Sequence, residues 1–587
     1  YSIVLNVIII SENVAQLKQL TFGWTDYTLF SGLLGISVLI GIYFGCFGKK
    51  QDNTTEYLLG GKTMSCFPVS MSLIASHISA VSLLAVPVEV YQYGTQYAAC
   101  IFTSIISCAL ISLIYLPVFY QLQLTSTFEY LEMRFTRSVR TFASFLYTLS
   151  LIIYVPLIIY VPALAFSQRL VLRRITNNNA INTFGGLKAV IWADTVQMTV
   201  TLGSLFAVFI LGTTAVGGIF ETWRISEEGS RIVFWKYDLG MATTWLSGLG
   251  ISQISMQRFL AVAIAFMGLC LVAIKWISVF TGLIMYAKYH KCDPISTHVI
   301  SRSDQLLPYY VLDVAADIPG LPGLFLAGLV SAGLSTMSAN LNTVAGTIYE
   351  DFIDPCLPDS SEKEKRAAKI MKVHHKVSSL LVLLDKSDIF RVSLTLHGVT
   401  SGAMLGIFSL GMLVPWATSK GAIAGGLLSM LSMIWIIVGA QVNMIQKRLV
   451  YPPLSTSTED CLNAEIASNQ TTMNTADILS NADDEPFILF TISFMYYALV
   501  GFLISMVVGT IVSFLFGVND LSEVDRNHFP PIVQRYGNIS VLISMKNGKT
   551  IHEHGRVVSD FYHRKNTPRF QCIRYRTRWR RMQKWKS

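Results

Sequence analysis

Charged residues are scarce in this sequence. Only 14% of its 587 residues are Asp, Glu, Lys or Arg, whereas 52% are hydrophobic. Soluble domains carry about 25% charged residues, and so little charge cannot cover the water-facing surface of a chain this long. The scarcity excludes a soluble globular protein and favours one whose solvent is the lipid bilayer.

Motifs of catalysis and of metal or nucleotide binding are also missing. The nine cysteines form no C-x-x-C pair and no metal-site spacing. There is no nucleotide loop, and HGVTSG at 397–402 lacks the G-x-S-x-G order of a hydrolase nucleophile. We therefore expect neither an enzyme nor a cofactor. The net charge of +9 comes from short loops and the C-terminal tail, so it does not indicate nucleic-acid binding.

Long apolar runs are abundant. A helix needs about 20 mostly apolar residues to cross a hydrocarbon layer of roughly 30 Å. Ten stretches meet this requirement, at 25–47, 67–87, 97–120, 143–166, 193–218, 261–288, 321–348, 393–416, 421–443 and 487–516. They predict an all-α bundle, because backbone groups in lipid must be bonded within each segment. We expect an extracellular N-terminal segment at 1–24, a transmembrane domain at 25–516 and a basic cytoplasmic tail at 517–587.

Basic residues indicate the loops that face the cytoplasm. They follow the first, third and seventh spans, at Lys49, Lys50 and Lys62, at Arg134, Arg137 and Arg140, and in the cluster 363–376. All three basic loops face the cytoplasm if the N-terminus is outside. The loop 444–486 carries a glycosylation sequon at Asn469 and is then expected outside, as in a plasma-membrane glycoprotein. That placement needs one more crossing, either an irregular one near 377–396 or a helix of which part is absent.

Cysteines offer little further guidance. Cys46, Cys66, Cys100, Cys108 and Cys270 fall in or beside apolar spans, where packed thiols are expected. Cys292 and Cys461 lie in polar loops, and the sequence favours two free thiols there over a disulfide.

Two spans carry an unusual number of small and polar residues. The first, SMSLIASHISAVSLLAVP at 70–87, is rich in Ser and holds His77 in its middle. Transporters bind ions where membrane helices are interrupted and backbone carbonyls become free. A histidine inside a membrane is a candidate functional residue; the alternative is that His77 only bonds a neighbouring carbonyl.

The second span is GLPGLFLAGLVSAGLSTMSANLNTVA at 320–345. Its small residues share one helix face, which by itself indicates close helix packing. The span also holds seven hydroxyl or amide side chains, at Ser331, Ser335, Thr336, Ser338, Asn340, Asn342 and Thr343. Hard cations such as Na⁺ prefer oxygen ligands. The hydroxyls of Ser335 and Thr336 and the carbonyl of Ala332 could supply three, and a facing broken helix two more.

Five segments carry a family resemblance: AVPVEVYQYG (85–94), FGGLKAVIWADTVQ (184–197), GLPGLFLAGLVSAGLSTMSANLNT (320–343), SLTLHGVTSGAMLGIFSLGMLVPW (393–416) and GVNDLSEVD (517–525). With these segments the chain resembles the sodium/solute symporter family, in particular its animal multivitamin, monocarboxylate and iodide transporters. The resemblance implies a LeuT-type fold of two inverted five-helix repeats plus peripheral helices.

The resemblance also implies site residues. The sodium ligands would be the carbonyls of Ala75, Ile78 and Ala332 and the hydroxyls of Ser335 and Thr336. Asp194 matches an acidic residue on the inner sodium pathway, although it could instead pair with Lys188. The solute would bind near Ser82, Ser252 and Gln253, and Ser252 stands where the family usually has Asn.

Three family helices look truncated. Residues 166–183 are polar and hold three arginines, 239–251 gives only 13 residues of helix, and 377–389 is too short to span. We expect a sodium-coupled importer of a small organic anion, such as a vitamin or a monocarboxylate. The alternatives are an uncoupled facilitator and a non-transporting membrane sensor or scaffold, which the truncations would favour.

Overall fold

Helices are the regular secondary structure of the residues that the computed structural model describes, and these residues contain no strand. The described residues are 23–43, 66–122, 124, 126–165, 186–234, 241–252, 261–297, 299–300, 302–348, 351–352, 389–446, 448–449, 451–461, 486–517 and 524–536. The chain divides into a unit at 1–533, which holds the helical bundle, and a second unit at 534–587.

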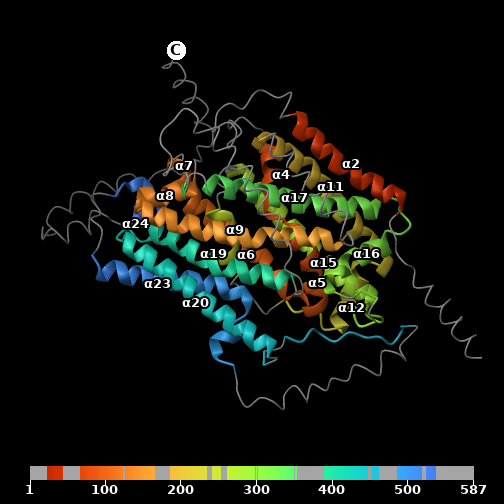
Figure 1. Ribbon diagram of the computed structural model, residues 1–587. Coiled ribbons are helices and arrows are strands. Elements are labelled where there is room, and N and C mark those ends of the chain that lie inside the picture. Colours follow the sequence, from red (N-terminus) through yellow and green to blue (C-terminus); the bar gives the residue numbers. More distant parts are fainter. Residues whose placement is uncertain are drawn as a thin grey trace, which may run out of the picture. The chain divides into compact units, whose positions relative to one another are not determined.

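Each of the ten predicted spans contains helix in its described residues, which confirms the all-α fold (Figure 1). The long helices are α2 (Trp24–Ile42), α4 (Cys66–His77) with α5 (Ala80–Tyr93), α6 (Ala99–Leu110) leading through a π turn into α7 (Leu116–Leu122), α9 (Arg137–Ala165), α11 (Gly186–Val216), α15 (Ala261–Tyr289), α17 (Leu321–Ile348), α19 (Ile389–Leu413), α20 (Ser419–Ile445) and α23 (Tyr497–Leu515). Shorter helices are α8 (Thr127–Arg134), α12 (Ile219–Glu228), α13 (Met241–Gly250), α16 (Leu306–Val314) and α24 (Pro531–Tyr536).

By length and composition, six helices of the described chain could each cross a membrane, and the bent pair α4–α5 would make a seventh. Two further apolar helices are shorter, Leu321–Met337 in α17 and His397–Leu413 in α19. The chain is thus a membrane protein with several helices able to span the bilayer.

Arg134 marks one end of the bundle, which we call the arginine end. Its Nη2 donates to the carbonyls of Val414 and Pro415 at 3.1 and 2.8 Å, so α19 ends beside α8. Arg140, near the start of α9, pairs with Asp351 just beyond α17 at 2.6 Å. The start of α9 and the ends of α17 and α19 therefore share this end.

Residues 451–461, which we call the strap, mark the opposite end. The Leu454 amide donates to the carbonyl of Gln92 in α5 at 2.8 Å. The buried Arg231 donates from Nε to the Tyr91 carbonyl at 2.9 Å and from Nη2 to the Ser455 carbonyl at 2.9 Å. Arg231 also lies with its guanidinium carbon 4.2 Å from the Tyr286 ring centroid. One arginine thus binds the strap to the ends of α5 and α15.

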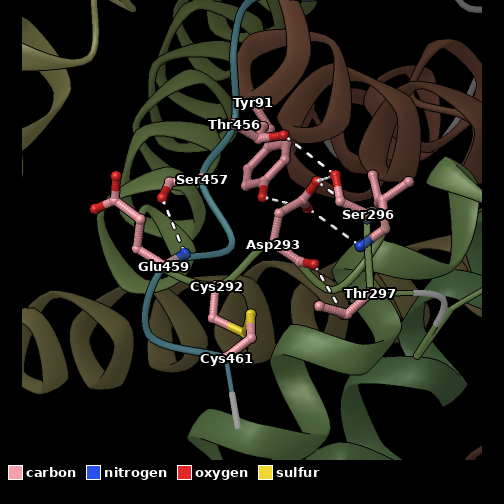
Figure 2. Close-up of a disulfide and its surroundings, with 10 residues drawn as sticks. Tyr91, Cys292, Asp293, Ser296, Thr297, Thr456, Ser457, Glu459 and Cys461 are labelled. Atoms are coloured by element: carbon pink, nitrogen blue, oxygen red, sulfur yellow. Dashed lines mark hydrogen bonds between the residues drawn. A yellow bond between two sulfur atoms is a disulfide. The ribbon is translucent and has the colours of Figure 1, made fainter. Parts of the chain in front are cut away.

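A disulfide joins Cys461 of the strap to Cys292, just after α15 (Figure 2). The expectation of two free thiols is therefore wrong. Asp293 beside it accepts from Tyr91 Oη at 2.7 Å and from Ser296 Oγ at 2.6 Å, and its amide donates to the Ser457 carbonyl at 3.1 Å. Sequence could not show this pairing, because 169 residues separate the two cysteines. Cys100, Cys108 and Cys270 are free, as expected.

Helix directions follow from these contacts. α4–α5 runs toward the strap end, and α6–α7 returns from it, because the amide of Thr95, just before α6, donates to the Arg231 carbonyl at 2.8 Å. Both α9 and α11 run toward the strap end, since Gly212 near the end of α11 packs against Ile284 near the end of α15. In the second half each direction is reversed. α13 lies parallel to α6, because Ser107 Oγ donates to the Ala242 carbonyl at 3.0 Å and Gly250 packs against Ile111, so it runs away from the strap end. α15 runs toward the strap end, and both α17 and α19 run away from it. The bundle therefore holds two inverted repeats, α4–α11 and α13–α19. The segments 166–185 and 353–388, where two truncations are predicted, lie outside the described residues.

The last helices place the strap relative to the bundle, and the additional crossing predicted near 377–396 lies mostly outside the described residues. α19, α20 and α23 lie side by side (Figure 1). Ser429 Oγ of α20 donates to the Gly501 carbonyl of α23 at 2.7 Å, and Ser513 Oγ of α23 lies 3.0 Å from the Thr418 amide, so these two helices are antiparallel. α20 ends at the strap end, and α23 returns to the arginine end.

Candidate functional site

The break between α4 and α5 lies at Ile78 and Ser79, within the span that the sequence singled out. The two helices are bent by 53°. Ser79 has an extended backbone, and its Oγ caps α5 by accepting from the Ser82 amide at 3.3 Å. A helix leaves its last carbonyls without intrahelical partners, and Ala75 lies in the last turn of α4. The local sequence thus supplies both the new helix start and the free carbonyls.

Thr336 of α17 meets those carbonyls. Its hydroxyl lies 3.2 Å from the Ala75 carbonyl oxygen and 3.0 Å from that of Ala332. The neighbouring Ser335 Oγ is buried and finds no hydrogen-bond partner among the described residues. An unpartnered buried hydroxyl costs free energy unless a ligand satisfies it. The donor set is therefore neutral oxygen, which suits a hard cation such as Na⁺.

The five predicted sodium ligands are all buried. Contacts bring Thr336, Ala75 and Ala332 together, Ser335 adjoins them in sequence, and Ile78 lies at the break itself. None of these residues carries a charge, so a monovalent cation would be held by dipoles from α4 and α17.

Asp194 lies on α11, which packs against α4. It is only 2% exposed and accepts from Ser72 Oγ at 2.5 Å. Ser76 Oγ in turn donates to the Ser72 carbonyl at 2.9 Å. The predicted alternative partner, Lys188, has a side chain outside the described part of the chain. Asp194 is thus tied to α4 one turn before Ala75, on the arginine-end side of the break.

A cavity of about 210 Å³ borders the ligand candidates. The predicted residues Ser82, Ser252, His77 and Thr336 all line it, whereas Gln253 lies outside the described residues. The helix α13 contributes Trp245, Ser247 and Gly248. The cavity therefore joins the broken helix, α13 and α17.

Two walls of the cavity were not predicted. α9 supplies Tyr147, Ser150 and Tyr154, and α19 supplies His397, Thr400, Ser401 and Met404. Both sets recur at helical spacing within apolar spans, which is the signal that would have revealed them. No Asp, Glu, Lys or Arg occurs among the described lining residues.

Membrane-spanning helices in inverted repeats, a broken helix with free carbonyls and a central polar cavity together define a solute transporter. The profile of the sodium:solute symporter family matches residues 57–429. The chain belongs to the sodium:solute symporter family, a family of sodium-coupled transporters and not of enzymes.

Individual relatives agree with this assignment. The chain is 34% identical to sodium-coupled monocarboxylate transporter 2 of Bos taurus, over 88% of this chain and 87% of that protein. It is 33% identical to sodium-coupled monocarboxylate transporter 1 of Homo sapiens, over 84% and 87%. It is 32% identical to a putative sodium-dependent multivitamin transporter of Drosophila melanogaster, over 85% and 87%.

A solved structure supports the fold. The chain superposes on a substrate-bound, outward-open Na⁺-coupled sialic acid symporter with a TM-score of 0.64 and 22% identity, over 85% of this chain and 99% of that one. The predicted LeuT-type fold is confirmed.

Proposed function

We propose that this chain imports a small organic anion together with Na⁺ across the plasma membrane by alternating access. The observation that carries the proposal is the Thr336 hydroxyl, which lies between the carbonyls of Ala75 and Ala332 at the wall of the cavity. Na⁺ held there would join α4 of the first repeat to α17 of the second. It would favour whichever conformation keeps these helices together, because a ligand shifts an equilibrium toward the state that it binds better.

Replacing Ser335 and Thr336 together with Ala tests the sodium site. Two of five ligands are lost, so we expect the Na⁺ concentration for half-maximal uptake to rise at least tenfold. Thr343→Ala is the matched control, because Thr343 is a buried hydroxyl on the same helix that bonds only within it, to the Ala339 carbonyl at 2.9 Å. Unchanged Na⁺ dependence in the double variant would remove the assigned site.

Asp194 is proposed to line the path by which Na⁺ leaves toward the arginine end. A buried carboxylate near the site attracts the departing cation, whereas an amide of the same shape does not. We expect Asp194→Asn to lower the turnover rate about tenfold while the half-saturating Na⁺ concentration changes less than threefold. Stopped-flow measurement of Na⁺ release would check this, with Ser72→Ala as the control that keeps the charge. Wild-type release from the Asn variant would contradict the role.

The solute class rests on chemistry shared by the relatives. Their names refer to monocarboxylates and vitamins, and the cavity near Ser82 and Ser252 is rich in hydroxyl groups. Uptake of lactate, biotin, pantothenate and iodide, measured in Na⁺ and again in choline, would identify the solute. Uptake that persists in choline would indicate an uncoupled facilitator instead.

The helix truncations predicted from the sequence favour one competing function, a membrane sensor or scaffold that binds Na⁺ without transport. Its signature would be Na⁺-dependent stabilisation of the purified protein with no uptake of any of the four solutes. The reverse pattern, uptake driven by a Na⁺ gradient, would exclude it.

The strap end is proposed to face the outside. Disulfides persist in oxidising compartments, and Cys292–Cys461 lies at this end. Glycosylation of Asn469, which lies outside the described residues, remains a prediction of the same orientation. A mobility shift on glycosidase treatment, lost in Asn469→Gln, would check it.

A further inference from the structure

Lys275 is a buried cation inside the membrane-spanning helix α15. The residue is only 7% exposed. None of the Asp and Glu residues that the structure describes forms an ion pair with it. A charge inside a membrane is costly unless something compensates it, and such residues usually mark substrate or ion pathways.

Neutral acceptors surround the Lys275 ammonium. Nζ donates to the Cys100 carbonyl at 3.1 Å and to Ser104 Oγ. It also lies 3.7 Å from the centroid of the Trp245 ring, which is a cation–π contact. Ser104 gives its own proton to the Cys100 carbonyl at 2.7 Å, so its oxygen is left to accept from the lysine. These groups hold a protonated amine without cancelling its charge.

Trp245 connects this cation to the cavity. The residue forms part of the cavity wall, together with Tyr97, which precedes Cys100 by three residues. The described lining residues carry no charge of their own. The indole Nε1–H of Trp245 is also buried without an acceptor among the described residues. This wall therefore offers the Trp245 Nε1–H as an unused hydrogen-bond donor. The uncompensated positive charge of Lys275 lies behind the same ring.

We propose that the carboxylate of the transported solute binds at this wall, because the positive charge of Lys275 acts on it across Trp245. The inference rests on the proposed function, since it names the residue that selects an anionic solute. In an interior of low dielectric the positive charge is screened far less than in water. A carboxylate in the cavity supplies the countercharge that Lys275 lacks, whereas an uncharged isostere gains nothing from it. Lys275 is thus a positioning residue that acts on the solute through its field.

Lactate and lactamide provide the test, because they share one shape and differ in charge. The full chain, purified in detergent with NaCl, is titrated with each compound, and the rise of its melting midpoint gives the half-saturating concentration. For the wild type we expect this concentration to be at least tenfold lower for lactate than for lactamide. Lys275→Gln is expected to abolish the preference, and Lys275→Arg to restore most of it.

Two controls separate this role from a structural one. Lys420→Gln removes a positive charge from an exposed residue and should keep the preference. Stabilisation by Na⁺ alone should persist in every variant, since no sodium ligand is changed. If Lys275→Gln does not fold, the wild-type comparison still decides, because equal response to lactate and lactamide overturns the inference.

The outcomes also distinguish the two proposals. A Lys275→Gln variant that keeps the wild-type preference overturns the role of Lys275 and leaves sodium-coupled anion import standing. A wild type that responds to Na⁺ but to none of lactate, biotin and pantothenate overturns both the anionic solute and this inference.

Discussion

The two inverted repeats contribute differently to the sodium-ligand candidates and to the cavity. The first repeat supplies the broken helix α4–α5, and the described part of the segment that opens the second repeat is α13. The sodium-ligand candidates come from α4 and α17 and use nothing of α13. The cavity, in contrast, takes Trp245, Ser247 and Gly248 from it. The difference teaches that the sodium-ligand candidates draw on the α4–α5 break and α17, whereas the cavity draws on the opening segments of both repeats.

The largest expected effect separates these two activities. Gly248 lines the cavity, and a Cβ added there would meet no atom within 4 Å. In Gly248→Leu the backbone is undisturbed, but the new side chain occupies much of a cavity of about 210 Å³. We expect solute uptake to fall at least a hundredfold, while stabilisation by Na⁺ in a melting experiment stays within twofold in concentration. Loss of both responses together would break the comparison between the repeats.

A smaller effect concerns the contact between the repeats. Gly328 of α17 packs against α11, and an added Cβ would lie 2.8 Å from Thr201 Oγ1 and 3.0 Å from Thr201 Cα. Overpacking of this kind costs about 1–3 kcal/mol, so Gly328→Ala should lower the melting midpoint. Gly346→Ala is the matched control on the same helix, where nothing lies within 4 Å. Equal midpoints for the two variants would show that the repeats are not closely packed at Gly328.

The sequence predicted the parts of the site that depend on short-range pattern. Serine-rich composition predicted an interruption within 70–87, which the structure locates at Ile78 and Ser79, and a run of hydroxyls indicated Ser335 and Thr336 as candidate ligands. The family resemblance added Ala75, Ile78 and Asp194. Neither the sequence pattern nor the resemblance could provide contacts between distant segments, such as the hydrogen bond from Ser72 to Asp194. The α9 and α19 walls were missed because their polar residues are spread thinly through apolar helices. Lys275 was missed although a lysine within the apolar span 261–288 is itself a signal of a functional residue.

The order in which the chain is synthesised determines when the Cys292–Cys461 disulfide can form. Cys292 is made 169 residues before Cys461, which at about 5–20 residues per second is a delay of roughly 8–34 s. During that time α17, α19 and α20 must all enter the membrane, because the strap follows α20. The bond can therefore form only after both repeats have been inserted. A chain that stops before the strap retains a free thiol at Cys292, so the oxidation state of this one cysteine reports whether synthesis passed both repeats and reached the strap.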